Sequence, residues 1–136
     1  MIQFYFLSIF INVLVGYALV FENDRDALEI KPGFSLRDET VRLILGIISM
    51  IVGVLKLLSP VEGDVLILGD LVPAAVGFAS GFILVYEYYK TRSTIARENE
   101  EKATLNVFLI RNKKILGYAA ITAAVLHFLF PKVLLL

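Results

Sequence analysis

The chain alternates between long apolar runs and short charged segments. Four of the apolar runs are close to the roughly 20 residues that an α-helix needs to cross the hydrocarbon core of a bilayer. They extend from Ile2 to Phe21, Val41 to Ser59, Val65 to Tyr86 and Ile115 to Leu136. The pattern therefore predicts an all-α, polytopic membrane protein in which four transmembrane helices form a single domain, residues 1–136.

Two pairs of these helices have similar sequences. Arg42 to Pro60 aligns without a gap with Lys113 to Pro131, and 7 of the 19 positions are identical. Gly16 to Glu22 matches Gly81 to Glu87 at four of seven positions. The similarity predicts two tandem two-helix hairpin repeats, about residues 1–60 and 65–131, related by a pseudo-twofold axis along the membrane normal. A chance match between two apolar helices of simple composition is the alternative.

Small residues recur at helical spacing along three of the predicted helices. Without a hydrophobic driving force between helices in lipid, such stripes allow backbones to approach closely and to pack. The residues predicted to pack are Gly46, Ser49, Gly53, Gly69, Gly77, Gly81, Gly117, Ala120 and Ala124. Pro73 lies on the third stripe and should kink its helix unless neighbouring groups satisfy the carbonyl that it frees.

Composition agrees with a membrane protein and narrows the chemistry. Hydrophobic residues make up 58% of the chain, against roughly 45 to 50% in soluble domains. There is no cysteine and one histidine, so disulfides and thiolate metal sites are excluded. The sequence has no His-Glu metal-ligand spacing and no Gly-rich phosphate loop. We therefore expect no enzyme, no cofactor and no metal site.

The distribution of charged residues indicates how the chain is oriented in the membrane and which molecules surround it. Eleven of the 13 basic residues lie in or beside the two longer connecting segments. The positive-inside rule then places these charged loops in the cytoplasm and both termini outside, in a bacterial-type inner or plasma membrane. The cluster Arg111, Lys113 and Lys114 is predicted to contact anionic lipid headgroups, with a docking face for a partner protein as the alternative. Net charge is zero, which gives no reason to expect a nucleic-acid partner.

Four polar residues inside the predicted spans are the candidate functional group: Asn12, Lys56, Asp70 and His127. A charge at the centre of a membrane helix costs about 2.5 to 3.5 kcal/mol on insertion scales, and such residues usually face the bundle interior. Lys56 and Asp70 could pair across the outer hairpin, and all four could line one pocket open to the outer side. Structural alternatives are snorkelling of the Lys56 stem, a structural ion pair for Asp70, and a hydrogen bond from His127 to a neighbouring helix.

The connecting segments should contain some helix. Ser35 to Glu39 resembles a capping box in which Ser35 accepts from the amide of Asp38, so the second helix should begin about one turn before the membrane, after a Pro32-Gly33 turn. The segment from Lys90 to Lys114 mixes charges over its first half, which is consistent with extension of the third helix. Val107 to Ile110 should then return to the interface.

Two classes of function fit these observations. The first is a non-catalytic integral membrane subunit that packs in and stabilises a larger membrane complex. The second is a small homo-oligomeric transporter or channel, which could be proton-coupled through the outer-half polar cluster. Besides the lipid bilayer, the expected partner is therefore another membrane protein or a second copy of the chain.

Overall fold

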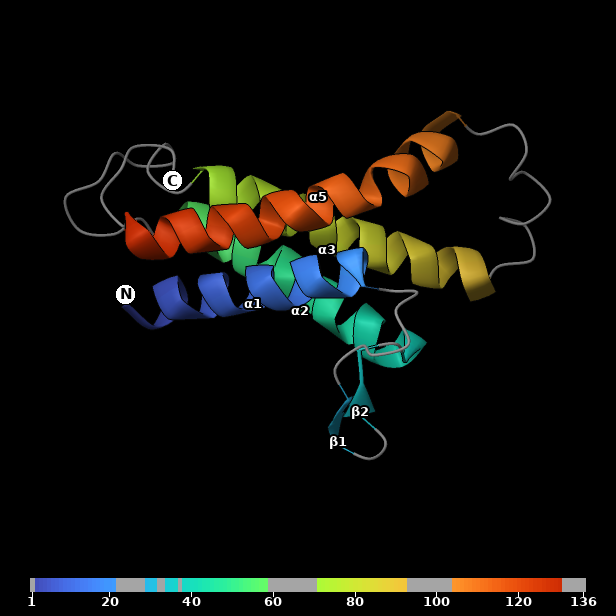
Figure 1. Ribbon diagram of the computed structural model, residues 1–136, viewed down its shortest axis with the longest axis horizontal. Helices are drawn as coiled ribbons and strands as arrows, with labels where there is room; N and C mark the ends of the chain where they lie inside the picture. Colours follow the sequence, from blue (N-terminus) through green and yellow to red (C-terminus); the bar gives the residue numbers. More distant parts are fainter. Residues whose placement is uncertain are drawn as a thin grey trace.

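The chain folds into a helical bundle with a small β-hairpin at one end (Figure 1). This computed structural model describes residues 2–21, 29–31, 34–36, 38–58, 71–92 and 104–130. Within these residues the helices are α1 Ile2–Val20, α2 Glu39–Leu58, α3 Leu71–Arg92 and α5 Thr104–Leu129. The predicted all-α, four-helix class is confirmed.

Three of the described helices, α1, α2 and α3, are long and apolar enough to cross a membrane. By length and composition, the chain is therefore a multi-pass membrane protein. With 26 residues, α5 is about 39 Å long at about 1.5 Å per residue. Lys113, Lys114 and His127 lower its mean hydropathy, and α5 is not among the three helices that qualify as spans.

Two helices extend further than the apolar runs alone indicated. The third predicted run ends at Tyr86, but α3 continues to Arg92. Similarly, α5 begins at Thr104, well before the predicted start at Ile115. The predicted return of residues 107–110 to the interface is thus part of one continuous helix. Helices run past the apolar boundary because their backbone hydrogen bonds do not require an apolar environment, and polar side chains can project into water.

A two-stranded antiparallel hairpin precedes α2, and the sequence did not predict it. The strands are β1 Glu29–Lys31 and β2 Phe34–Ser35, with Lys31 opposite Phe34. Strands of two or three residues are too short to show a period of two. Leu36, which follows β2, is 4% exposed and belongs to the apolar core. The predicted Pro32-Gly33 turn falls outside the described residues.

The residue that caps α2 is Asp38, not Ser35. Asp38 Oδ1 accepts from the Thr40 N–H at 2.8 Å, and the Asp38 carbonyl accepts from the Arg42 N–H at 2.9 Å. Ser35 contributes its backbone carbonyl, which accepts from the Asp38 N–H at 3.0 Å. A Ser35 cap would place Leu36 in the first helical turn, whereas Leu36 lies before α2 and is buried in the apolar core. Helix α2 still begins shortly before its apolar run, as predicted.

Close backbone contacts join the helices in two pairs. The most extensive packing is between α1 and α5 and between α2 and α3. A Cβ atom added to Gly16 would lie 2.6 Å from the Gly117 carbonyl oxygen, and one added to Gly81 would lie 2.6 Å from the Gly46 carbonyl oxygen. Because Cβ contacts below 3.0 Å are essentially never seen, both pairs require glycine.

The other residues of the predicted stripes lie inside the bundle wherever the structure describes them. A Cβ on Gly53 would lie 2.9 Å from the Ala74 carbonyl oxygen. Ala120 and Ala124 have no exposed surface. Gly69 lies outside the described residues.

Candidate functional site

A buried basic and aromatic cluster, formed by Tyr5, Lys56 and His127, joins three helices. Lys56 is 2% exposed and His127 has no exposed surface. The Lys56 Nζ lies 5.2 Å from the centroid of the Tyr5 ring. The Tyr5 and His127 ring centroids are 4.7 Å apart, and the Tyr5 hydroxyl donates to the His127 backbone carbonyl at 2.7 Å. Tyr5 on α1 therefore lies between the basic residues of α2 and α5.

This geometry explains how a lysine can be accommodated in an apolar bundle. An ammonium group near the face of an aromatic ring is stabilised by the ring quadrupole, by about 2 kcal/mol or more when water is excluded. The Tyr5 hydroxyl bond holds that ring against α5. The predicted partner of Lys56, Asp70, lies outside the described residues. Sequence reasoning missed Tyr5, because an aromatic residue in an apolar run has no distinguishing pattern.

Asn12 belongs to a second polar network, deeper in the bundle. It lies seven residues from Tyr5 along α1, a rise of about 10 Å. Its Nδ2 donates to the Pro73 carbonyl at 3.0 Å, and the Ser49 Oγ donates to the Gly77 carbonyl at 2.7 Å. The structure thus brings Lys56 and His127 together around Tyr5, and it places Asn12 with Ser49 against α3.

Close approach of Asn12 to α3 depends on Gly77. A Cβ at Gly77 would lie 2.5 Å from Asn12 Oδ1. The carbonyl that Asn12 bonds is that of Pro73 itself. Residue 69, whose carbonyl a helical proline at position 73 would free, lies outside the described residues, so the predicted kink stays a prediction.

An ion triad of Arg42, Glu87 and Lys113 lies toward the other end of the bundle. Arg42 Nη2 donates to Glu87 Oε2 at 2.6 Å, and Lys113 Nζ donates to Glu87 Oε1 at 3.0 Å. Arg42 Nη1 also donates to the Ala18 carbonyl of α1 at 2.8 Å. The side chains are 7%, 17% and 16% exposed for Arg42, Glu87 and Lys113. One carboxylate therefore connects α2, α3 and α5, and Arg42 extends the network to α1.

Sequence reasoning did not assign this triad. All three residues lie near the ends of apolar runs, where charges usually meet water or headgroups. One signal was available, because Arg42 and Lys113 occupy the same position in the two aligned helices. Two basic residues at equivalent positions are a reason to look for a shared carboxylate.

The three residues predicted at lipid headgroups have different surroundings. Arg111 and Lys114 are exposed. Lys113 points to Glu87 and its side chain is 16% exposed. Headgroup contact stays a prediction for this cluster. Among the described residues there is no group of three or more His, Asp or Glu side chains that could hold a metal ion.

Comparisons place the chain among related sequences. An uncharacterized protein of Treponema pallidum (strain Nichols) is 29% identical over 137 residues, which cover 100% of both chains. No solved structure matches the chain significantly. A protein-family model matches residues 1–127, a range that holds α1, α2, α3 and nearly all of α5. The chain therefore belongs to the family that this model describes.

Proposed function

We propose that the chain is a non-catalytic integral membrane subunit that packs in and stabilises a larger membrane complex. The observation that supports this most is the use of intramembrane polar groups as bonds between helices of the same bundle. Asn12 and Ser49 bond carbonyls of α3, and Tyr5 bonds a carbonyl of α5. Since each interhelical hydrogen bond in a membrane contributes only about 0.6 to 2 kcal/mol, several are needed to hold a small bundle rigid.

The outer surface of such a bundle is available for a neighbouring protein. Helix α2 presents a long apolar face, and its exposed large residues are Ile44, Ile47, Ile48, Ile51, Val54, Leu55 and Leu58. Branched side chains on a rigid helix provide a defined surface for packing. A subunit role requires no more of the chain than this surface and a stable interior.

Native mass spectrometry of tagged protein, extracted gently from its own membranes, tests the proposal. We expect a second protein at fixed stoichiometry. In that complex, Lys56→Met should reduce the amount of assembled complex, because the buried cluster helps to position α2 against α1. Phe10→Leu, a mild change at an exposed residue of α1 outside that face, is the control. Recovery of a homo-oligomer without a second protein would contradict the subunit role.

We also propose the finer architecture of two tandem hairpins, with α5 as the fourth span. Under the sequence alignment, Gly16 corresponds to Gly81 and Gly46 to Gly117. The close contact of Gly16 with Gly117 and that of Gly46 with Gly81 are then equivalent contacts. This is the arrangement expected if residues 1–60 and 65–131 are copies related by a pseudo-twofold axis.

Two further pairs of aligned residues support the duplication. Arg42 and Lys113 both bond Glu87. Lys56 and His127 both face the ring of Tyr5. In each case, two basic residues at equivalent positions of the alignment contact the same residue, which is Glu87 for the first pair and Tyr5 for the second.

The proposed topology has both termini outside and the charged loops in the cytoplasm of a bacterial-type plasma membrane. The excess of basic residues in those loops supports it. Reporter fusions at Glu62 and Lys102 test it. An outside signal at Glu62 and a cytoplasmic signal at Lys102 are expected, and the opposite pair of signals would invert the topology.

A second candidate function is a small homo-oligomeric transporter or channel that couples to protons. The observation that favours it is the burial of two ionisable side chains, Lys56 and His127, at one depth of the bundle. Ionisable residues inside a membrane commonly mark ion or proton pathways. A single four-helix chain offers little wall for a path, so this function requires at least a dimer.

Flux measurements in proteoliposomes distinguish the two functions. In a transporter, His127→Gln should abolish proton or solute flux while the protein keeps its folded mass and helical content. In a subunit, the same change should act through stability alone. Tyr5→Phe, which keeps the ring beside both basic residues, is the control for local packing.

A further inference from the structure

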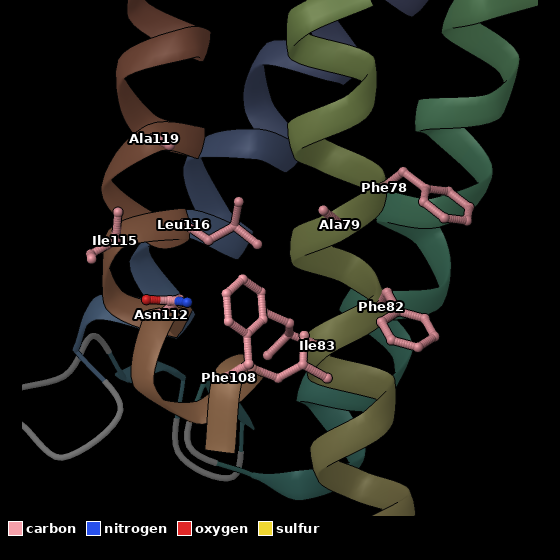
Figure 2. Close-up of a pocket in the computed structure, with 10 residues that line it drawn as sticks. Phe78, Ala79, Phe82, Ile83, Phe108, Asn112, Ile115, Leu116 and Ala119 are labelled. Atoms are coloured by element: carbon pink, nitrogen blue, oxygen red, sulfur yellow. The ribbon is translucent and has the colours of Figure 1, made fainter. Parts of the chain in front are cut away.

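A groove of about 630 Å³ lies between α3 and α5 (Figure 2). One rim is formed by two exposed residues of α5, Phe108 and Ile115. Figure 2 shows Phe108, Leu116 and Ile83 between the two helices, whereas the rings of Phe78 and Phe82, which also belong to the lining, lie on the side of α3 away from α5. The groove is therefore an elongated apolar surface that can bind a narrow apolar molecule.

Asn112 is the one polar residue among those that line the groove. Figure 2 shows it on the α5 wall between Phe108 and Leu116. Along α5, the lining extends from Phe108 to Ala119, a rise of about 16 Å at about 1.5 Å per residue. Beyond Asn112, the rise to Ala119 is about 10 Å, which is about two thirds of the depth of one leaflet, about 15 Å. This part of the groove can therefore hold most of the length of an acyl chain.

Positive charge is concentrated at the end of the groove that holds Phe108. The described parts of α3 and α5 contain five lysine and arginine residues, which are Lys90, Arg92, Arg111, Lys113 and Lys114. Lys113 bonds Glu87, and Arg92 pairs with Glu39 of α2. Arg111 and Lys114 are exposed, so these two residues can attract an anion at this end of the pair of helices.

Arg111 is the basic residue best placed beside the groove. It lies three residues after Phe108 and four residues before Ile115, so it shares a helix face with both rim residues. Its side chain is exposed. A guanidinium group at this point can bind a phosphate oxygen, and the adjacent Asn112 amide can donate to a phosphate or ester oxygen.

We propose that the groove binds one acyl chain of an anionic phospholipid, with the phosphate at Arg111 and Asn112. The exposed basic residues at one end match a phospholipid headgroup, and the apolar lining beyond Asn112 matches an acyl chain. The proposal is independent of the subunit function.

Quenching of a single tryptophan by brominated lipids tests this site. The chain has no tryptophan, so Phe108→Trp introduces one reporter at the groove, where Figure 2 shows the Phe108 ring between the two helices. Ile47→Trp on the exposed face of α2 is the control. The two lipids are compared at each position separately, so the two reporters need not lie at the same depth. Each protein is reconstituted in phosphatidylcholine with a small fraction of brominated phosphatidylglycerol or of brominated phosphatidylcholine.

At the groove, we expect brominated phosphatidylglycerol to bind about fivefold better than phosphatidylcholine, the ratio equivalent to about 1 kcal/mol for one basic residue near an anionic headgroup. At position 47, the two lipids should quench equally. In the Phe108→Trp protein, Arg111→Gln should abolish the preference. Arg92→Gln should keep it, because Arg92 is exposed and already pairs with Glu39 at 3.5 Å. Ala119→Phe, which fills the deep end of the groove, should also abolish it.

Three results would overturn the proposal. Equal quenching by both lipids at the groove would mean that bulk lipid alone covers this face. Absence of quenching by either lipid at the groove, with normal quenching at position 47, would mean that a second copy or another protein covers it. Retention of the preference in the Arg111→Gln protein would remove Arg111 from the site.

Discussion

Replacement of Glu87 by Gln should be among the most destabilising single changes in the bundle. The substitution keeps the size of the side chain but removes the only carboxylate that Arg42 and Lys113 share in the described structure. At 2.6 and 3.0 Å, each Coulomb attraction amounts to about 6 kcal/mol with an effective dielectric constant of about 20. Desolvation of the charges offsets much of this attraction.

The net effect follows from what remains after the change. Loss of one partner from a buried ion pair costs about 3 to 5 kcal/mol, because the other charge stays buried. Glu87→Gln leaves two cations near each other, so we expect a loss in the upper part of that range. Lys113→Gln leaves the bond from Arg42 to Glu87 intact and should cost about 1.5 to 3 kcal/mol, the contribution of one charged hydrogen bond.

Reversible unfolding in mixed detergent and SDS micelles, followed by circular dichroism, measures these free energies. The decisive comparison is a double-mutant cycle. In the Glu87→Gln background, Lys113→Gln should cost less than it does in the wild-type protein, since the charged bond between Lys113 and Glu87 is already lost. Arg92→Gln, in an exposed pair at 3.5 Å, is the control and should cost about 0 to 1 kcal/mol. A loss below about 1 kcal/mol for Glu87→Gln, or equal costs of Lys113→Gln in both backgrounds, would refute the reasoning.

Three smaller predictions can be checked by the same unfolding measurement. Gly81→Ala should cost about 1 to 3 kcal/mol, because its Cβ would lie 2.6 Å from the Gly46 carbonyl oxygen; an unchanged stability would show that the helices separate freely. Ser49→Ala should cost about 0.5 to 1.5 kcal/mol by losing its bond to α3. In contrast, Ser80→Ala should be neutral or stabilising, because the buried Ser80 Oγ has no hydrogen-bond partner among the described residues; equal losses for the two serines would contradict this. Tyr5→Phe should cost about 1 kcal/mol and Tyr5→Leu about 2 kcal/mol more, since only the second removes the ring beneath the buried ammonium; equal losses would show that the ring contributes nothing.

The helices could be predicted from the sequence because a membrane span has a simple requirement. About 20 apolar residues are enough to indicate one, and the runs that start at Ile2 and Val41 match α1 and α2 closely. The helix ends that extend beyond the apolar runs were harder to predict from the sequence. The segment from Thr104 to Asn112 forms helix, but its short apolar stretch between polar residues also suits a loop that touches the interface.

The side-chain contacts were harder to predict than the helices. Lys56 and His127 were selected because ionisable residues are rare in apolar runs, and both are buried. Their common neighbour Tyr5 was missed because its role depends on which helices adjoin α1. The Glu87 triad was missed for the same reason, since residues 42, 87 and 113 meet only when three helices are in place.

The contact between Gly16 and Gly117 has a consequence for biogenesis. These glycines belong to the first and the last helix of the bundle, so α1 cannot reach its main packing partner until α5 has been synthesised. At about 5 to 20 residues per second, the 100 residues between them take about 5 to 20 s to translate. During that time α1 must be held by lipid, by the insertion machinery or by weaker contacts with α2 and α3. A chain released before α5 would keep an unpaired glycine face in the membrane, and we expect membrane proteases to remove it.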